Sequence, residues 1–188
     1  MERMTVEEYR QLSQVDPKRS YIGRVNKAQG ESFENLVNDA CEYYKMKGIA
    51  CIKKTPEPMK PISKQMPDGS FKAVFTKKAQ ADYKGTLKEG GKSIGFEAKH
   101  TDTDRMQQSR VTKEQSDDLD DMQEMNARCF VLCSFGFSRF FRVPWGVWKN
   151  MNQIYGRKYV TPADIEQYEI TYNGTLLFLN ESEVLPND

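Results

Sequence analysis

The sequence predicts an α/β protein in which a mixed central β-sheet is flanked by helices and carries a protruding stalk. Apolar residues recur at helical spacing in residues 30–47 and 112–126, and short apolar runs typical of strands lie before, between and after them. A third observation is the Pro- and Lys-rich stretch 54–78, which does not resemble a domain interior. With 188 residues, the chain is long enough for one domain with a sizeable core, expected at residues 30–188.

The first 29 residues are expected to form a flexible basic N-terminal arm. Arg19, Arg24 and Lys27 lie there among small and polar residues. Such an arm could follow the phosphates of a nucleic acid, or it could be an ordinary frayed terminus.

The segment 30–47 is expected to be a helix, because Phe33, Val37 and Tyr44 fall on one buried stripe. Glu34 borders that stripe and does not lie opposite to it. Its carboxylate could therefore reach the functional edge of the sheet. Alternatively, as an acid in the first turn, it would only complement the helix dipole.

A strand expected at 49–53 leads into the stretch 54–78, whose four prolines exclude a helix. Residues 71–75 mix basic and apolar side chains, Phe-Lys-Ala-Val-Phe, and are interpreted as an exposed ribbon. Lysines beside aromatic side chains can hold a nucleic-acid backbone and stack on its bases. The stretch is therefore interpreted as a protruding basic stalk, and the alternative is a disordered loop with ordinary solvated lysines.

The candidate catalytic residues lie on the two apolar segments that follow the stalk. Asp82 is on the first, and Glu97 and Lys99 are on the second, after a Gly-rich turn. Alternate side chains share a face of a strand, so Glu97 and Lys99 point the same way. If the segments pair as a hairpin, two carboxylates and one ammonium converge, which suits magnesium-assisted hydrolysis of a phosphodiester. The alternative is a solvated sheet face that carries these charges by chance.

Beyond this hairpin, Thr112 and Gln115 fit a capping box at the start of the second helix. Gln115 also lies on the face of Leu119, so its amide could instead point inward at the site. The remaining expected elements are a buried strand at 127–134, a strand at 139–143, a short helix from Pro144, a short helix from Thr161-Pro162, and a hairpin of 168–172 with 175–179.

Charge is unevenly distributed along a chain whose net charge is only +1. Residues 1–100 contain 19 Lys/Arg and 13 Asp/Glu, which gives +6, whereas residues 101–188 contain 9 and 14, which gives −5. The basic half favours a polyanionic partner, although solubility alone also explains scattered charges.

The four cysteines lie in apolar runs without zinc-like spacing and are expected to be buried free thiols. No apolar run approaches the length of a membrane span, and no signal peptide is recognisable, so no membrane partner and a cytoplasmic location are expected.

Several short motifs together resemble one protein family, the RecU-type Holliday junction resolvases of the PD-(D/E)xK nuclease superfamily. The similarity extends from about Gly23 to Trp148. It is carried by Gly30-Glu-Ser-Phe-Glu34, Tyr43-Tyr44, Lys53-Lys-Thr-Pro56, Ala81-Asp-Tyr-Lys-Gly85, Phe96-Glu-Ala-Lys99 and Cys129-Phe-Val-Leu132.

The resemblance implies a restriction-endonuclease-like fold and a homodimeric, magnesium-dependent endonuclease that cuts four-way DNA junctions in recombination and repair. Manganese is the alternative metal ion. By position, Asp82 and Glu97 would bind the metal, Lys99 would position or activate the attacking water, and Glu34 would support the site from its helix. Gln115 would occupy the family's helix position behind the sheet.

The resemblance also makes the stalk the element that reaches into the centre of a four-way junction. Recombinase proteins would be further partners. The residues expected to contact DNA are Lys53, Lys54, Lys60, Lys64, Lys72, Phe75, Lys77 and Lys78. Two alternatives stay open: a related nuclease that acts on flaps or duplex DNA, and a non-catalytic DNA-binding module.

The sequence departs from the family pattern at three places. Gln80 and Ala81 stand where hydroxyl residues often precede the motif aspartate, and Gly95 stands where an acid is common. The helix with Gln115 lacks a histidine that is common near it. His100, which follows Lys99, is expected to be an ordinary polar residue.

Overall fold

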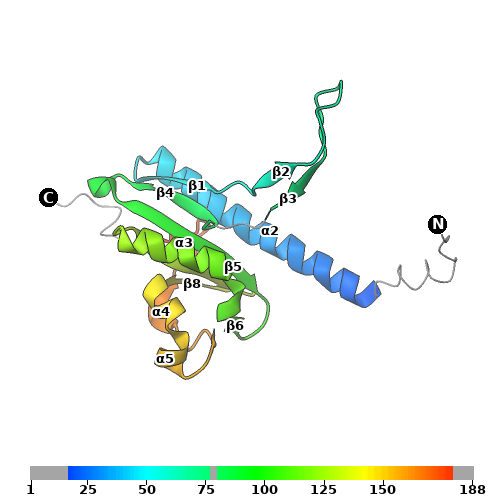
Figure 1. Cartoon of the computed structure of the whole chain (residues 1–188). Helices are drawn as coiled ribbons and strands as arrows, with labels where there is room; N and C mark the ends of the chain where they lie inside the picture. Colours follow the sequence, from blue (N-terminus) through cyan, green and yellow to red (C-terminus); the bar gives the residue numbers. More distant parts are fainter. Residues whose placement is uncertain (1–16, 77–79, 180–188) are drawn as a thin grey trace.

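The computed structural model describes residues 17–76 and 80–179, and its centre is a six-stranded mixed sheet with the order β1-β4-β5-β7-β8-β10 (Figure 1). The α/β class and the protruding stalk predicted from the sequence are confirmed. The strands are β1 (Ala50–Lys54), β4 (Tyr83–Leu87), β5 (Ser93–Thr101), β7 (Arg128–Phe135), β8 (Arg139–Pro144) and β10 (Glu169–Ile170).

The pairing of the sheet follows from its connections. Strands β4 and β5 form an antiparallel hairpin through the short helix η1 (Glu89–Gly91), as the sequence predicted. Strands β5 and β7 are parallel, and the crossover between them contains α3 (Lys113–Glu124). A parallel pair needs such a crossover, which places α3 against one face of the sheet. The remaining neighbours in the sheet are antiparallel.

The helix α2 (Pro17–Met46) covers one face of the sheet. Its predicted stripe is buried, with Phe33, Val37 and Tyr44 at 1% exposure or less. Beneath it, the rings of Tyr83 and Phe96 stack at 4.9 Å, and Phe96 stacks on Phe130 of β7 at 4.7 Å. These three rings are cross-strand neighbours in register, so aromatic packing and strand pairing fix the same alignment.

The opposite face is covered by α3 and by the short helices α4 (Trp145–Lys149) and α5 (Met151–Tyr155). Leu119 and Trp145 pack there against the side chains of β7 and β8 that face this side. A two-stranded sheet of β6 (Met106–Gln107) and β9 (Tyr159–Val160) lies beside them. The short helix η2 (Gln108–Arg110) directly follows β6 in the chain. The strand β7 is buried along nearly its whole length, as predicted for a central strand.

The stalk is a two-stranded ribbon of β2 (Met59–Pro61) and β3 (Ala73–Phe75) that pairs only with itself (Figure 1). Its base is closed by a hydrogen bond in which the N–H of Thr76 donates to the carbonyl oxygen of Pro58 at 2.9 Å. The ring of Phe75 is 70% exposed. Lys77 and Lys78 lie outside the described residues.

The helix α2 begins at Pro17, so the predicted start at Gly30 is wrong. A proline is well tolerated in the first helical turn, and no later proline interrupts residues 18–46. The polar character of residues 18–29 favours an arm, but the helix continues through them. Residues 1–16 of the expected arm lie outside the described part of the chain.

Two predictions for the C-terminal region are also wrong. Thr161-Pro162 starts a turn, in which the Asp164 carboxylate accepts hydrogen bonds from Thr161 and pairs with Arg157, and the short helix η3 (Glu166–Tyr168) begins only after that turn. The expected hairpin is reduced to one bridge between Tyr172 and Leu176.

The segment after that bridge contributes to the core instead of to a strand. Leu176 and Phe178 are buried against the α2 face, and the ring of Phe178 meets that of Tyr44 at 5.2 Å. Strand β10, which precedes the bridge, pairs with β8. Burial of these side chains therefore takes precedence over the hairpin signal.

Three of the four cysteines are buried free thiols as predicted, and Cys51 is the exception. It is exposed because the alternation of β1 turns Ala50 and Ile52 into the core. Among residues 17–76 and 80–179, no helix combines the length and the apolar character needed to cross a membrane.

Candidate active site

Asp82 lies immediately before β4, at the position that faces Glu97 when the β4–β5 register is continued by one residue. The turn before it is held by α3: the N–H of Ala81 donates to the Asp118 carboxylate at 2.7 Å. Asp118 also pairs with Lys84 at 2.8 Å. The position of Asp82 is thus fixed by both the sheet and a helix.

Glu97 and Lys99 point to the same face of β5, the face covered by α3, while Phe96 and Ala98 belong to the α2 side. This is the alternation predicted from the sequence. Glu97 is fully buried at 0% exposure, whereas the side chain of Lys99 retains 14% exposure. The ammonium therefore lies between a buried carboxylate and the solvent-accessible side of the site.

The three charged side chains contact one another directly. Lys99 Nζ lies 2.9 Å from Asp82 Oδ2 and 2.6 Å from Glu97 Oε2. The N–H of Asp82 donates to Glu97 Oε1 at 3.0 Å, and the N–H of Ala98 donates to Asp82 Oδ2 at 3.3 Å. The predicted convergence of two carboxylates and one ammonium is therefore present in the fold.

Burial and charge act in opposite directions on this cluster. Burial raises the pKa of Glu97 to about 8, against the lowering effect of the Lys99 ammonium, and Asp82 raises it further. Burial alone would lower the pKa of Lys99, but the carboxylates of Asp82 and Glu97 outweigh it and raise that pKa above its usual value. A carboxyl group with a raised pKa in a cavity is typical of a functional site.

Gln115 adopts both of the roles that the sequence left open. As the N3 residue of α3, it completes a capping box: Thr112 N–H donates to Gln115 Oε1 at 3.1 Å, and Gln115 N–H donates to Thr112 Oγ1 at 3.3 Å. Its side-chain Nε2 donates a long hydrogen bond of 3.4 Å to Asp82 Oδ1. One amide therefore links the start of α3 to the candidate metal ligand.

Two substitutions separate these roles. Gln115→Ala should lose both contacts and destabilise the protein by about 1–2 kcal/mol in urea unfolding. Gln115→Glu keeps an acceptor for the cap but replaces the donor to Asp82 with a second negative charge. We expect the glutamate variant to be destabilised in the absence of divalent metal ions, because its carboxylate repels that of Asp82. In the double variant with Asp82→Asn, where the repulsion is removed, stability should recover.

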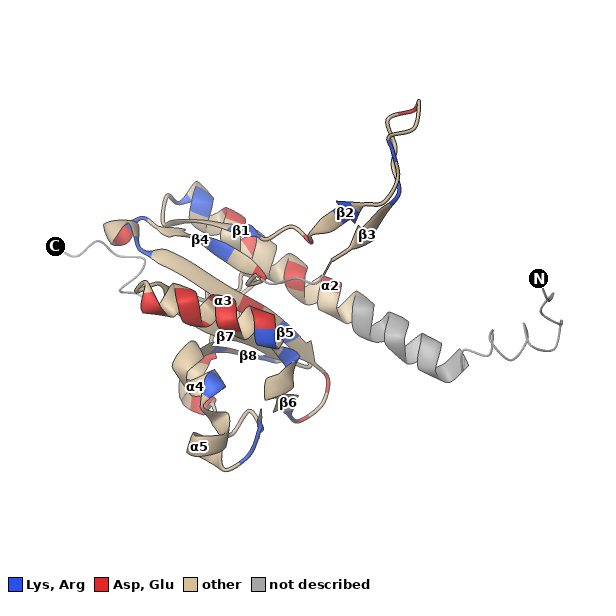
Figure 2. Ribbon diagram, viewed as in Figure 1, with Lys and Arg blue, Asp and Glu red and all other residues tan. Residues whose placement is uncertain are grey.

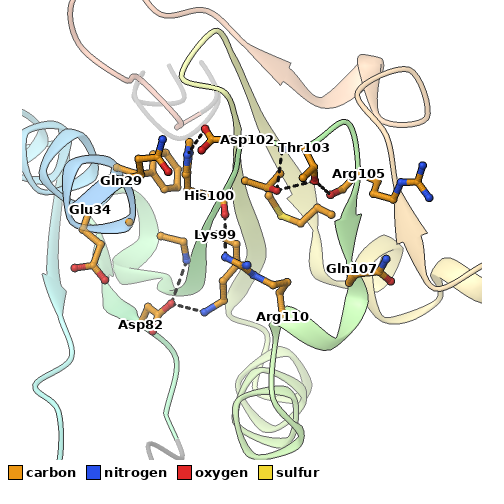
Figure 3. A pocket seen from close by; sticks show the side chains of 15 residues that line it. Gln29, Glu34, Asp82, Lys99, His100, Asp102, Thr103, Arg105, Gln107 and Arg110 are labelled. Atoms are coloured by element: carbon orange, nitrogen blue, oxygen red, sulfur yellow. Dashed lines mark hydrogen bonds and ion pairs between the residues drawn. The ribbon is translucent and has the colours of Figure 1, made fainter. Parts of the chain in front are cut away.

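Glu34 lines the cavity of the site, but it does not lie in the first turn of its helix as expected. Since α2 begins at Pro17, Glu34 lies in the middle of the helix, and the first-turn dipole explanation does not apply. Its carboxylate pairs with Lys54 of β1. It lines a cavity of about 540 Å³ together with Asp82 and Lys99 (Figure 3).

The donor set fits a hard divalent cation. Asp82 and Glu97 both present carboxylate oxygens to the same site. The buried Glu97 Oε2 accepts no hydrogen bond of ordinary geometry, and its close neighbour is the Lys99 ammonium. Within the described residues, no group of three or more His, Cys, Asp or Glu side chains could hold a metal. Two carboxylates suit magnesium, which keeps several waters and substrate oxygens as its other ligands.

The stalk residues lie away from this cluster. The side chains of Lys60, Lys64, Lys72 and Phe75 are exposed on the ribbon, while exposed Lys53 and Lys54 lie on β1 at the edge of the sheet. Figure 2 shows basic residues on the stalk and acidic residues along α3. The uneven charge of the sequence therefore corresponds to separate surfaces of the molecule.

Two of the departures noted in the sequence have a structural counterpart. Ala81 is fully buried, and its position is fixed through its backbone N–H by Asp118, not through a side-chain hydroxyl. At Gly95, an added Cβ would lie 2.6 Å from the end of the Met122 side chain, so the methionine fills the space that a side chain would need.

The cavity also contains polar residues that the sequence analysis did not assign to the site. The ring of His100 is buried, with Nδ1 3.0 Å from Ser134 Oγ and Nε2 3.1 Å from Asp102 Oδ1. Arg110 of η2 donates from Nη2 to the carbonyl oxygen of His100 at 2.8 Å. The sequence spacing of Lys99 and Arg110 does not indicate that they are neighbours, because the chain between them passes through a loop, β6 and η2.

Comparisons with known proteins show which chains this one is similar to. The chain is 33% identical over 171 residues to a Holliday junction resolvase RecU from Listeria welshimeri, covering 84% of each chain. It is 29% identical over 163 residues to a protein of the same name from Streptococcus sanguinis, covering 77% of this chain and 80% of the other. Hjc, a Holliday junction resolvase of Archaeoglobus fulgidus, superimposes with a TM-score of 0.45 at 9% identity, covering 71% of this chain and 92% of Hjc.

A family model supplies the assignment. The model described as RecU, recombination protein U, matches residues 28–184, which include every candidate site residue from Glu34 to Gln115. The chain belongs to the RecU family of recombination proteins.

Proposed function

We propose that this protein is a magnesium-dependent, structure-selective endonuclease that resolves Holliday junctions by hydrolysing phosphodiester bonds. The observation that carries the proposal is the contact of Lys99 with both Asp82 and Glu97, at the wall of a cavity of about 540 Å³ that Asp82 and Lys99 line. The names of the RecU relatives support the choice of a four-way junction as the substrate.

Each side chain of the cluster has a defined role in this proposal. Asp82 and Glu97 would hold magnesium, which when bound supplies positive charge for the phosphate and lowers the pKa of a coordinated water. Lys99 holds the attacking water or steadies the negative charge that develops on the phosphate. Gln115 orients Asp82 through its amide, and Glu34 supports the site from α2 while paired with Lys54. Manganese is the expected substitute for magnesium.

The substrate also suggests how the protein assembles and where it works. A four-way junction offers two equivalent strands for cleavage, so we propose a homodimer with one active site for each strand. The stalk would reach the centre of the junction, with Phe75 and the lysines around it in contact with DNA. Recombinase proteins are proposed as further partners, and the cytoplasm as the place of action.

The test is a cleavage assay on an end-labelled four-way junction, run with magnesium, with manganese and with a chelator. Paired nicks at symmetric positions that require the metal are expected. Linear duplex and flap substrates of the same sequence serve as competitors. Equal cleavage of linear or flap DNA would make the protein a nuclease of broader selectivity, and tight binding without nicks under either metal would make it a binding module.

A further inference from the structure

The cavity that Asp82 lines is also lined by three cationic side chains, Lys99, Arg105 and Arg110. These three differ in the number of ion pairs that they form with carboxylates. Lys99 is paired with two carboxylates. Arg105 is paired with Asp104 at 3.2 Å and lies over the ring of Tyr159 at 5.3 Å. Arg110 is exposed, and within residues 28–76 and 80–179 it forms no ion pair. Of these cations, Arg110 retains the most capacity to bind an incoming anion.

The backbone of β5 holds this guanidinium. Arg110 Nη2 donates to the carbonyl oxygen of His100 at 2.8 Å, and His100 is the residue that follows Lys99. His100 is in turn fixed by Ser134 on β7 and by Asp102. Figure 3 shows the Arg110 side chain reaching β5 beside Lys99, whereas Arg105 extends away from the cluster. The guanidinium is therefore positioned relative to the strand that carries Glu97 and Lys99.

The hydrogen bond to His100 uses one N–H of the guanidinium and leaves the others for a second partner. A guanidinium presents five N–H donors in a rigid planar fork, which matches two oxygens of a phosphate. The Lys99 ammonium is already paired with the carboxylates of Asp82 and Glu97, so the cluster offers little free positive charge to a DNA phosphate. A cation at Arg110, outside that ion-paired cluster, attracts the phosphate as the strand enters the cavity.

We propose that Arg110 is a further substrate-contacting residue, whose guanidinium binds non-bridging oxygens of the scissile phosphate or of the phosphate next to it. The inference rests on the proposed nuclease function, and it assigns a phosphate-binding subsite to the η2 side of the cavity. The carbonyl of His100 sets the distance between this subsite and Lys99.

The first experiment compares Arg110→Gln, Arg110→Lys and Arg105→Gln in junction cleavage. Loss of one charge-assisted phosphate contact should lower kcat/KM by roughly 10- to 100-fold in Arg110→Gln. Arg110→Lys should recover part of this, because it restores the charge but not the fork. Arg105→Gln, the matched control from the same cavity wall, should change the rate by less than about threefold, since its guanidinium is already engaged.

The second experiment locates the contact without metal or turnover. Junctions carrying a single neutral methylphosphonate at successive positions are titrated in chelator, with wild type and with Arg110→Gln. At the contacted phosphate, neutralisation should weaken wild-type binding by roughly 10-fold and leave the binding of Arg110→Gln unchanged. This coupling should occur at the cleavage position or at its immediate neighbour.

The outcomes separate this inference from the function on which it rests. If every methylphosphonate weakens wild type and Arg110→Gln equally, while wild type still cuts junctions, Arg110 holds no phosphate and the inference fails alone. Coupling at a position several nucleotides from the nick would also overturn it. A wild type that neither binds nor cuts junctions would overturn the proposed function, and the subsite with it.

Discussion

Replacement of Lys99 by alanine is expected to reduce junction cleavage by roughly 10²- to 10⁴-fold while junction binding in chelator stays near the wild-type level. The ammonium lies within 3 Å of both candidate metal ligands, so its removal deletes the positive charge that the two carboxylates hold at the site. It makes little contribution to the area that touches DNA, because only 14% of its side chain is exposed. Single-turnover cleavage and a filter-binding titration measure the two effects separately.

Asp82→Asn should behave in the same way, because the amide keeps the shape of the side chain but is a poor ligand for a hard cation. Lys149→Ala is the control: its ammonium also pairs with an aspartate, Asp120 at 2.7 Å, but it lies outside the cavity of Asp82. Thermal melting of all variants shows whether each has folded. If either site variant cuts junctions at the wild-type rate, the assignment of the active site is wrong.

Deletion of the stalk is expected to abolish most junction affinity and to leave the core intact. The N–H of Thr76 already meets the carbonyl of Pro58, so a Gly-Gly linker can replace residues 59–75 without moving the sheet. Three lysines leave with the ribbon: Lys60, Lys64 and Lys72. If each contacts one phosphate, the slope of log affinity against log salt concentration should become shallower by roughly 2.7.

A triple variant with glutamine at these three lysines is the matched control for the deletion. It should reproduce the change in salt slope but retain the stacking contribution of Phe75, so its affinity should lie between those of wild type and the deletion. Circular dichroism and a melting temperature close to that of wild type would verify the fold. A deletion variant that binds junctions with an unchanged salt slope would show that the stalk is not a DNA-binding element.

The parts of the structure that the sequence predicted well are those governed by strand periodicity. A period of two placed Glu97 and Lys99 together, and the hairpin of β4 and β5 then required Asp82 to face them. The buried run of β7 and the capping box of Thr112 and Gln115 are likewise local patterns with one physical meaning. These features follow from short stretches of sequence because their partners are neighbours in the sheet or the helix.

The parts that were missed depend on contacts between distant segments. Nothing local indicates that Asp118 holds Ala81, or that the loop after β5 returns Arg110 to the carbonyl of His100. The early start of α2 was missed because the basic and small polar residues of 18–29 outweighed the helical spacing of Tyr21, Val25 and Ala28. The hairpin predicted near Asn173-Gly174 failed because burial of Phe178 decides the course of that segment.

The position of β5 in the sheet has a consequence for how motion is distributed in the molecule. This strand has a hydrogen-bonded neighbour on each side, and helices cover both faces, so its amides open only when much of the core opens. The stalk is an isolated two-stranded ribbon, which is marginally stable by itself and can bend or open locally. The protein thus joins a rigid candidate active site to a flexible stalk. If the stalk contacts branched DNA as proposed, it can bend to follow the shape of the DNA without changing the distances between Asp82, Glu97 and Lys99.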